Sequence, residues 1–82
     1  MRLDLFLKMS RLIKRRSLAK EICDAGCVRI NGRIAKAGAE VKVADVLTVD
    51  IRDRLIRARI LHLPLRVEGP EGVVEMLTEE SE

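Results

Sequence analysis

The sequence has almost no aromatic residues: Phe6 is the only one, and tryptophan and tyrosine are absent. Proteins that read single-stranded nucleic acids stack bases on aromatic side chains, so that kind of binding is not expected. Glutamine is also absent and Asn31 is the single asparagine, which argues against a helix that reads base edges in the DNA major groove. The core must be built from aliphatic side chains.

Histidine and cysteine are scarce too. His62 lies between two leucines, and no nucleophile elbow, phosphate loop or clustered carboxylates accompany it, so we expect no enzyme and a packing or surface histidine. Cys23 and Cys27 form no CxxC pair, and their spacing supports no zinc site. We expect reduced thiols in or near the core, and no metal ion or cofactor.

Long hydrophobic runs are missing as well. Asp4 and Lys8 interrupt the apolar residues at the amino terminus, which argues against a signal peptide or a membrane-spanning helix. The 82 residues contain no internal repeat. We therefore expect one small domain, a monomer without membrane contact, in the cytoplasm.

Charge is divided unevenly along the chain. Residues 1–42 hold eleven lysines and arginines against four acids, a net charge of +7, whereas residues 43–82 hold five arginines against nine acids, a net charge of −4. The halves add to the net charge of +3. This polarity predicts one face for a polyanion and an opposite end that avoids one.

Two helices are predicted in the basic half. Leu3, Phe6 and Leu7 share a helical face, with Asp4 in the first turn, which predicts a helix at about residues 2–9. The second apolar stripe consists of Leu18, Ala19, Ile22 and Cys23. This helix begins at Lys14 or uses Ser17 as its cap; we favour the earlier start and an end near Ala25, before a left-handed Gly26.

Strand signals follow the second helix. Residues 28–30 alternate, and Asn31-Gly32 is the strongest hairpin signal in the chain, which we expect to hold Arg29 and Arg33 beside the helix. Residues 46–51, 56–60 and 73–77 are further strands, and Pro64 makes residues 61–67 irregular. The pattern predicts an α+β fold of two short helices packed on a small, mostly antiparallel sheet.

The cations of the helix–hairpin unit predict a phosphate-binding surface. At the start of the second helix, basic side chains combine with backbone amides that face an anion, and recognition by phosphate position and shape suits structured RNA. Arg16 is expected to face outward beside Lys20 with no buried partner. The predicted RNA-binding residues are Arg2, Lys8, Arg11, Lys14, Arg15, Arg16, Lys20, Arg33 and Lys36. The alternative is a protein-interaction module with a solvated basic face, which docks a partner through the Arg57/Arg59 strand or the acidic tail.

The chain resembles the S-four RNA-binding domain, also called the αL motif. The resemblance covers about residues 2–51 and rests on Arg2-Leu3-Asp4, Arg16 with Ala19, Ala25-Gly26, Val28-x-Ile30-Asn31-Gly32, Lys36 and Val41…Asp45-Val46-Leu47. In that family the two helices and the hairpin turn bind RNA, which implies roles for Arg2, Arg16 and Lys20. Residues 52–77 would then be a strand extension that completes the sheet, and residues 78–82 a frayed acidic tail.

The stand-alone members that this chain most resembles act in bacterial ribosome-associated quality control. The resemblance implies binding to obstructed large ribosomal subunits, with contacts to rRNA and peptidyl-tRNA. There the protein would assist the partner factor RqcH in adding alanine tails to the stalled chain. A heat-shock relative that recycles large subunits is the alternative, although it normally carries a longer basic carboxyl-terminal extension.

The chain departs from the family pattern at two turns. Lys14 stands where the family often has Ser or Thr, so the usual side-chain cap of the second helix is missing. Val43-Ala44-Asp45 stands where the family usually has Pro-Gly-Asp. A positive φ at Ala44 would cost on the order of 1 kcal/mol.

Overall fold

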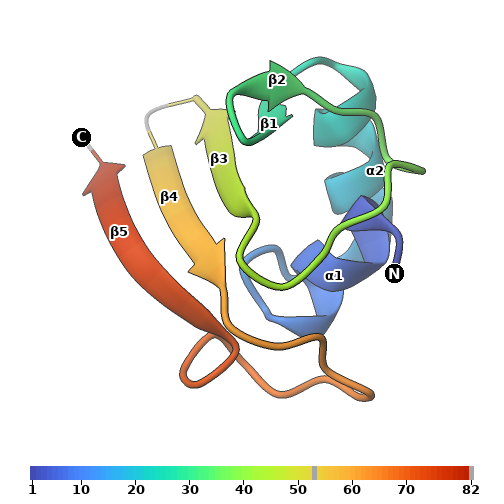
Figure 1. The fold of residues 1–82 in the computed structure, drawn as a ribbon. Helices are drawn as coiled ribbons and strands as arrows, with labels where there is room; N and C mark the ends of the chain where they lie inside the picture. Colours follow the sequence, from blue (N-terminus) through green and yellow to red (C-terminus); the bar gives the residue numbers. More distant parts are fainter. Residues whose placement is uncertain (53, 82) are drawn as a thin grey trace.

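Two short helices and a five-stranded antiparallel sheet make up the fold (Figure 1). The computed structural model describes residues 1–52 and 54–81. The elements are α1 (Leu3–Met9), α2 (Arg16–Asp24), β1 (Val28–Ile30), β2 (Arg33–Ile34), β3 (Val46–Ile51), β4 (Arg54–Ile60) and β5 (Val74–Ser81). The strand order is β2-β1-β3-β4-β5. The predicted α+β class is confirmed, and the pairing order, which the sequence pattern left open, is now defined.

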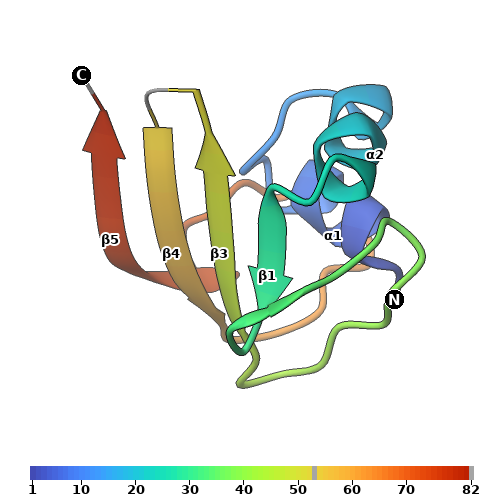
Figure 2. The ribbon, with the colours of Figure 1, turned by 90° about the horizontal axis from the view of Figure 1, so that it is seen from above.

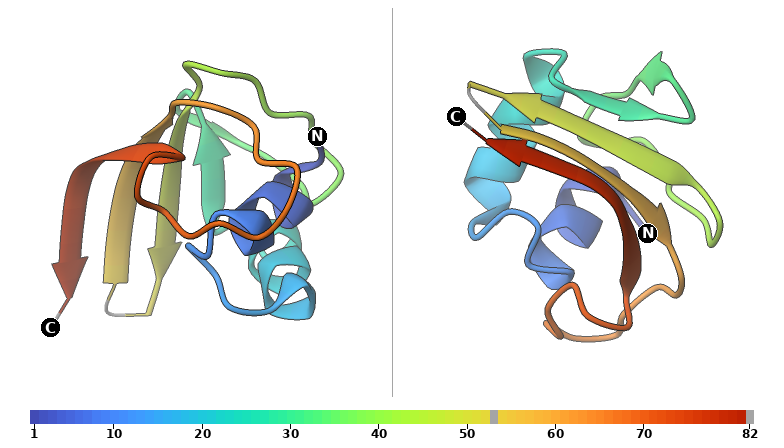
Figure 3. Two further views of the ribbon diagram at one scale, coloured as in Figure 1. Left: turned by 90° about the horizontal axis from the view of Figure 1, so that it is seen from below. Right: turned by 90° about the vertical axis from the view of Figure 1, so that its left-hand side faces the viewer.

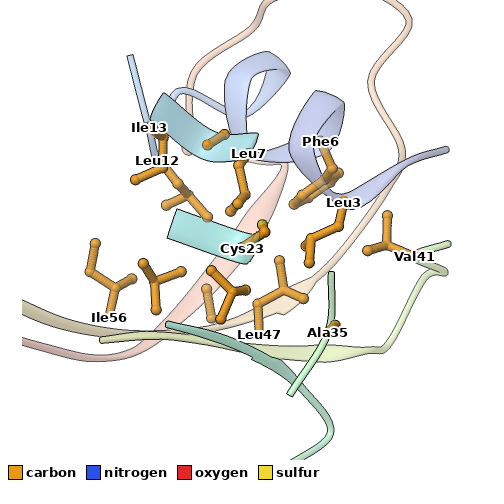
Figure 4. Packing of buried hydrophobic residues seen from close by; sticks show 14 of the residues in the cluster. Leu3, Phe6, Leu7, Leu12, Ile13, Cys23, Ala35, Val41, Leu47 and Ile56 are labelled. Carbon is orange, nitrogen blue, oxygen red and sulfur yellow. The ribbon is translucent and has the colours of Figure 1, made fainter. Parts of the chain in front are cut away.

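Both helices pack on one face of the sheet, with an aliphatic core between the two layers (Figures 2 and 4). The residues that the core buries most completely include Leu3, Phe6, Leu7, Cys23, Val28, Val41, Leu47, Val49, Ile56, Ile60 and Val73. Burial raises the pKa of the Cys23 thiol to about 11, and Cys27 is half-buried, so both cysteines lie where they were predicted. Among the described residues, no helix is long and apolar enough to cross a membrane.

Helix α2 ends as predicted but starts later. Gly26 has φ +83°, its N–H bonds the Cys23 carbonyl at 3.0 Å, and the Cys27 N–H bonds the Ile22 carbonyl at 3.0 Å. This is the Schellman arrangement that a left-handed glycine permits. The predicted start at Lys14 is wrong: Arg15 is extended, with φ −122° and ψ 136°, and makes no side-chain cap hydrogen bond. Without a capping side chain, the helix begins only at Arg16.

The Asn31-Gly32 turn joins β1 to β2 as predicted. Both residues have positive φ, 51° and 86°, which is the type I′ turn that matches the twist of a hairpin. The Asn31 amide also accepts a hydrogen bond from the Val46 N–H at 2.9 Å and donates one to Asp45 at 3.0 Å. The asparagine therefore fastens the hairpin to the start of β3.

Arg29 and Arg33 do not both flank α2, contrary to expectation. Paired residues of an antiparallel ladder share a face, and Arg33 pairs with Ile30, whereas Arg29 pairs with Thr48 on the outer face of the sheet. Neighbouring residues of a strand point to opposite faces, so the one-residue offset separates the two arginines. Arg29 therefore points away from the helices.

The last strand of the sheet is longer than predicted. Residues 78–81, expected to form a frayed tail, continue β5 and pair with β4 as far as Ser81 opposite Arg54. Residues 61–67 are irregular, as Pro64 predicted, and the loop continues to residue 73, before β5. The loop runs past the end of α1, where the Glu68 N–H bonds the Met9 carbonyl at 3.0 Å (Figure 3). Asp53, in the turn between β3 and β4, and Glu82, at the end of the predicted tail, lie outside the described residues.

Ala44 stands where the S-four family usually has a glycine, and it has the positive φ, 78°, that glycine adopts easily. Its side chain is exposed, and its N–H bonds the Ile60 carbonyl at 2.9 Å. The backbone of the turn is thus held by the sheet even though alanine disfavours this conformation. The turn stores strain that glycine would relieve.

We predict that Ala44→Gly raises the free energy of unfolding by about 1 kcal/mol, because glycine adopts a positive φ without a Cβ clash. Denaturant unfolding followed by circular dichroism measures the change. The matched control is Ala25→Gly, since Ala25 is also exposed but has φ −82°. The control should lose stability, and a loss at both positions would contradict the strain at Ala44.

Candidate nucleic-acid interface

The nine cations predicted to bind RNA lie on α1, α2, the segment between them, the hairpin and the loop that follows it, and all are at least partly exposed. They do not form one continuous stripe. Seven of the nine fall into three groups, which we call the Asp4 cluster (Arg2, Asp4, Arg16), the Asp24 cluster (Lys20, Asp24, Lys36) and the Lys8 hollow (Lys8, Arg11, Lys14).

The Asp4 cluster joins the two helices through a buried carboxylate. Asp4 is 2% exposed. The Arg2 guanidinium donates to both Asp4 oxygens, at 3.1 and 3.4 Å, and the Arg16 Nε donates to Asp4 Oδ2 at 3.4 Å. The Leu5 N–H donates to Asp4 Oδ1 at 2.8 Å. One carboxylate thus holds two guanidiniums side by side, and each remains about half exposed, with room to bind a phosphate.

The charge state of Asp4 follows from these contacts. Burial by itself raises the pKa of the carboxyl group. The hydrogen bonds from Arg2 and from the Leu5 N–H, with the charges of Arg16 and Arg2, outweigh burial and lower the pKa below its ordinary value. The carboxylate is therefore ionised at neutral pH, and it reduces the cluster to a net charge of +1.

Arg16 therefore has a buried partner, and the expectation that it had none is wrong. The pairing spans twelve residues and requires the first turns of α1 and α2 to lie close together. Lys20, expected to extend outward beside Arg16, instead pairs with Asp24 one turn further along. The two cations belong to different clusters.

The Asp24 cluster connects the end of α2 to the loop after the hairpin. Lys20 Nζ lies 3.0 Å from Asp24 Oδ2, Lys36 Nζ donates to the Asp24 carbonyl at 3.1 Å, and the Ala37 N–H donates to Asp24 Oδ1 at 3.3 Å. The hydrogen bonds from Lys20 and Ala37 lower the pKa of Asp24. The aspartate fixes the positions of both lysines, whose ammonium groups stay at the surface.

The Lys8 hollow is a shallow depression beside the turn that ends α1. Arg11 has φ 59°, and its N–H bonds the Lys8 carbonyl at 3.0 Å, which brings the two side chains to the same depression as Lys14. Within the described part of the chain, no carboxylate forms an ion pair with any of the three. A phosphate in this hollow would meet three cations and no competing acid.

The remaining two predicted residues lie apart from these groups. Arg15 is the exposed N-cap of α2, next to the Asp4 cluster in sequence, and Arg33 is exposed on the hairpin. The residues that sequence reasoning missed are the aspartates. Asp4 and Asp24 are two of only four acids in a half of the chain with eleven cations, and that scarcity is the signal that marks them.

Comparison with known proteins gives a family for this arrangement. The model of the S4 domain matches residues 1–47, which include α1, α2 and the hairpin. The RQC P-site tRNA stabilizing factor of Halalkalibacterium halodurans is 47% identical over 72 residues, 88% of this chain and 82% of that protein. The protein of the same name from Bacillus subtilis is 54% identical over 63 residues, 77% of this chain and 73% of that protein.

The fold is also found in a solved structure. The chain superposes on the trimeric structure of Heat Shock Protein 15 of Vibrio cholerae with a TM-score of 0.86, over 95% of this chain and 82% of that chain, at 25% identity. The likeness extends through β4 and β5, beyond the residues that the S4 domain matches. From the domain match and the identities of 47% and 54%, the chain belongs to the S4 domain family and, within it, to the RQC P-site tRNA stabilizing factors, RqcP.

Proposed function

We propose that the chain is a ribosome-associated quality control factor that binds structured RNA, namely large-subunit rRNA and the P-site peptidyl-tRNA of an obstructed large subunit. The observation that carries the proposal is the exposed cationic face of α1 and α2, present in a chain about half identical to factors named for P-site tRNA stabilization. The Asp4 cluster, the Lys8 hollow, the Asp24 cluster, Arg15 and Arg33 are the proposed RNA contacts.

The finer role is a binding role without catalysis. Bound to peptidyl-tRNA, the protein would hold the tRNA in place while RqcH adds alanine residues to the stalled chain. Residues 2–51 would supply the RNA-binding domain, and residues 52–77 the strands that support it. The proposal places the protein in the cytoplasm, as a monomer on the ribosomal particle.

The heat-shock alternative, recycling of obstructed large subunits, is supported by the fold likeness to Heat Shock Protein 15. The identity to that protein is 25%, against 47% and 54% to the stabilizing factors. The sequence evidence therefore favours the quality control role. The two roles differ in whether alanine tails depend on the protein.

A reconstituted reaction tests the proposed function. Large subunits that carry peptidyl-tRNA are incubated with RqcH and alanyl-tRNA, with and without this protein, and the tail length is measured on a gel. Longer tails in its presence support the role. Co-sedimentation of the protein with large subunits that weakens steeply with salt would support RNA binding alone, because phosphate neutralisation releases counterions. Binding without an effect on tails would favour the heat-shock alternative.

Arg16→Ala should weaken binding to large subunits by roughly 1–3 kcal/mol and flatten the salt slope by about one unit, because a phosphate-contacting guanidinium is lost. Arg16→Lys should recover only part, since an ammonium cannot form two parallel hydrogen bonds. The control is Arg59→Ala, which removes an arginine paired with Glu75 on the sheet. If Arg59→Ala binds more weakly than Arg16→Ala, the RNA-binding face has been assigned to the wrong side of the molecule.

Asp4→Asn should weaken RNA binding although it removes a negative charge from a cationic face, because Asp4 holds Arg2 and Arg16 in position. Simple electrostatics predicts the reverse. The matched control is Glu21→Gln, which removes an exposed carboxylate from α2 and should leave the affinity equal or slightly higher. Filter binding at fixed salt measures both variants. Tighter binding by Asp4→Asn would exclude a positioning role.

The stability that Asp4 contributes should depend on pH. Because the folded-state pKa lies below the unfolded value, this stability is fully present above about pH 4 and is lost as the pH falls through the folded pKa. At neutral pH, Asp4→Asn should cost about 1.5–3 kcal/mol, the range for hydrogen bonds to a charged group. Denaturant unfolding of both proteins from pH 7 to pH 2 should show the difference shrinking, and a constant difference would contradict the ion pairs.

A further inference from the structure

The loop of residues 61–73 reaches the Lys8 hollow from the opposite end of the chain (Figure 3). The Glu68 N–H donates to the carbonyl of Met9, the last residue of α1, at 3.0 Å. The last carbonyls of a helix have no partner within the helix, so this hydrogen bond completes the end of α1. The loop lies outside residues 1–47, which the S4 domain matches, yet it contacts the turn that follows the first helix of that domain.

Gly69 lies against the side chain of Arg11. It is buried, although its neighbours Glu68 and Pro70 are exposed. It has φ +94°, and a Cβ in its place would lie 4.0 Å from Arg11 Cδ. An arginine can pack its aliphatic stem while its guanidinium stays in solvent, and Arg11 is exposed. The loop therefore restricts the stem of Arg11 and leaves its charge free to bind.

The backbone of Arg11 is held as well. Its φ is 59°, and its N–H bonds the Lys8 carbonyl at 3.0 Å. The Ser10 side chain is fully buried before it, where the hydroxyl donates to the Leu7 carbonyl at 3.3 Å and accepts from the Leu12 N–H at 3.5 Å. With backbone and stem both held, the guanidinium loses less conformational freedom when it binds an anion.

We propose that Gly69 is a positioning residue for RNA binding: together with the Glu68–Met9 hydrogen bond, it holds the Arg11 guanidinium in the Lys8 hollow, where it binds a phosphate. This role rests on the proposed function, which supplies the phosphate. The Glu68 carboxylate points to His62, with Oε1 3.6 Å from Nε2. The loop therefore acts on Arg11 by packing rather than by charge.

Gly69→Ala and the matched control Gly72→Ala test the positioning in the free protein. Gly72 lies in the same loop and has φ +83°, but a Cβ in its place would meet no atom within 4 Å. Both variants force a positive φ on alanine, so both should lose similar stability to denaturant. Only Gly69→Ala should free Arg11, seen by NMR as a lower heteronuclear NOE of its Nε–Hε group. An NOE that is unchanged in Gly69→Ala overturns the role of Gly69.

Co-sedimentation with large ribosomal subunits tests the consequence for RNA. Arg11→Ala should bind about tenfold more weakly, with the salt slope flatter by about one unit. Gly69→Ala should bind about threefold more weakly, the cost of ordering one long side chain. It should add no further loss to Arg11→Ala, because both act through one guanidinium. Independent losses that add, or an equal loss in Gly72→Ala, would overturn the positioning role.

A second pair of variants keeps the test open if Gly69→Ala does not fold. Glu68→Pro removes the N–H that donates to Met9 and should lower both the Arg11 NOE and the affinity, whereas Glu68→Gln keeps the N–H and should change neither. Equal behaviour of these two variants contradicts the role of the loop. If Arg11→Ala binds like the wild type, this role is wrong while the Asp4 cluster and the proposed function stand. A wild-type protein that does not sediment with large subunits overturns both.

Discussion

A single buried carboxylate, that of Asp4, organises the cationic half of the molecule. It accepts hydrogen bonds from Arg2 and Arg16 and thereby ties the start of α2 to the start of α1. A buried charge is costly unless it is fully paired, and here every described contact of the carboxylate is a donor. The position of α2 and the directions of two guanidiniums thus depend on the same interaction.

Asp24 performs a related task at the other end of α2. Its side chain and carbonyl bind Lys20, Lys36 and the Ala37 N–H, while the Asp4 N–H bonds the Ala37 carbonyl at 3.2 Å. The loop after the hairpin is therefore bound to both helices. In a face with a large excess of positive charge, these aspartates limit repulsion between neighbouring cations and restrict their side chains. The cost is a smaller net charge available to a polyanion.

Local signals in the sequence predicted the parts of the fold that local chemistry determines. Gly26 and Asn31-Gly32 require positive φ, and the alternation of residues 46–51 and 56–60 separates a buried face from an exposed one, so these elements were placed correctly. The partner of Arg16, Asp4, lies twelve residues away on the other helix. The hydrophobic periodicity of each helix does not indicate which polar side chains of the two helices meet. The composition of residues 78–81 predicted a frayed acidic tail. In the structure these residues instead form backbone pairs with β4, which the composition does not indicate. The start of α2 was misplaced because no side chain caps it.

The candidate site was predictable as a set of residue types but not as an arrangement. The excess of lysine and arginine before residue 43 identified the cations. Their division into three groups depends on Asp4, on Asp24 and on the turn at Arg11, which are tertiary features. The register of the hairpin, which sends Arg29 to the outer face and Arg33 to the helix side, depends on pairing that the sequence pattern did not define.

Strand β5 forms one edge of the sheet, and within residues 1–52 and 54–81 no other strand pairs with its outer side, where only Val74 forms an isolated bridge to Glu71 (Figure 1). Such an edge is a template on which strands of other molecules can add. Glu75 and Glu79 interrupt it with charge, and a second copy pairing along β5 would bring glutamates of both chains close together. The same ion pairs that hold β5 against β4 therefore place acids where they discourage aggregation through the sheet edge.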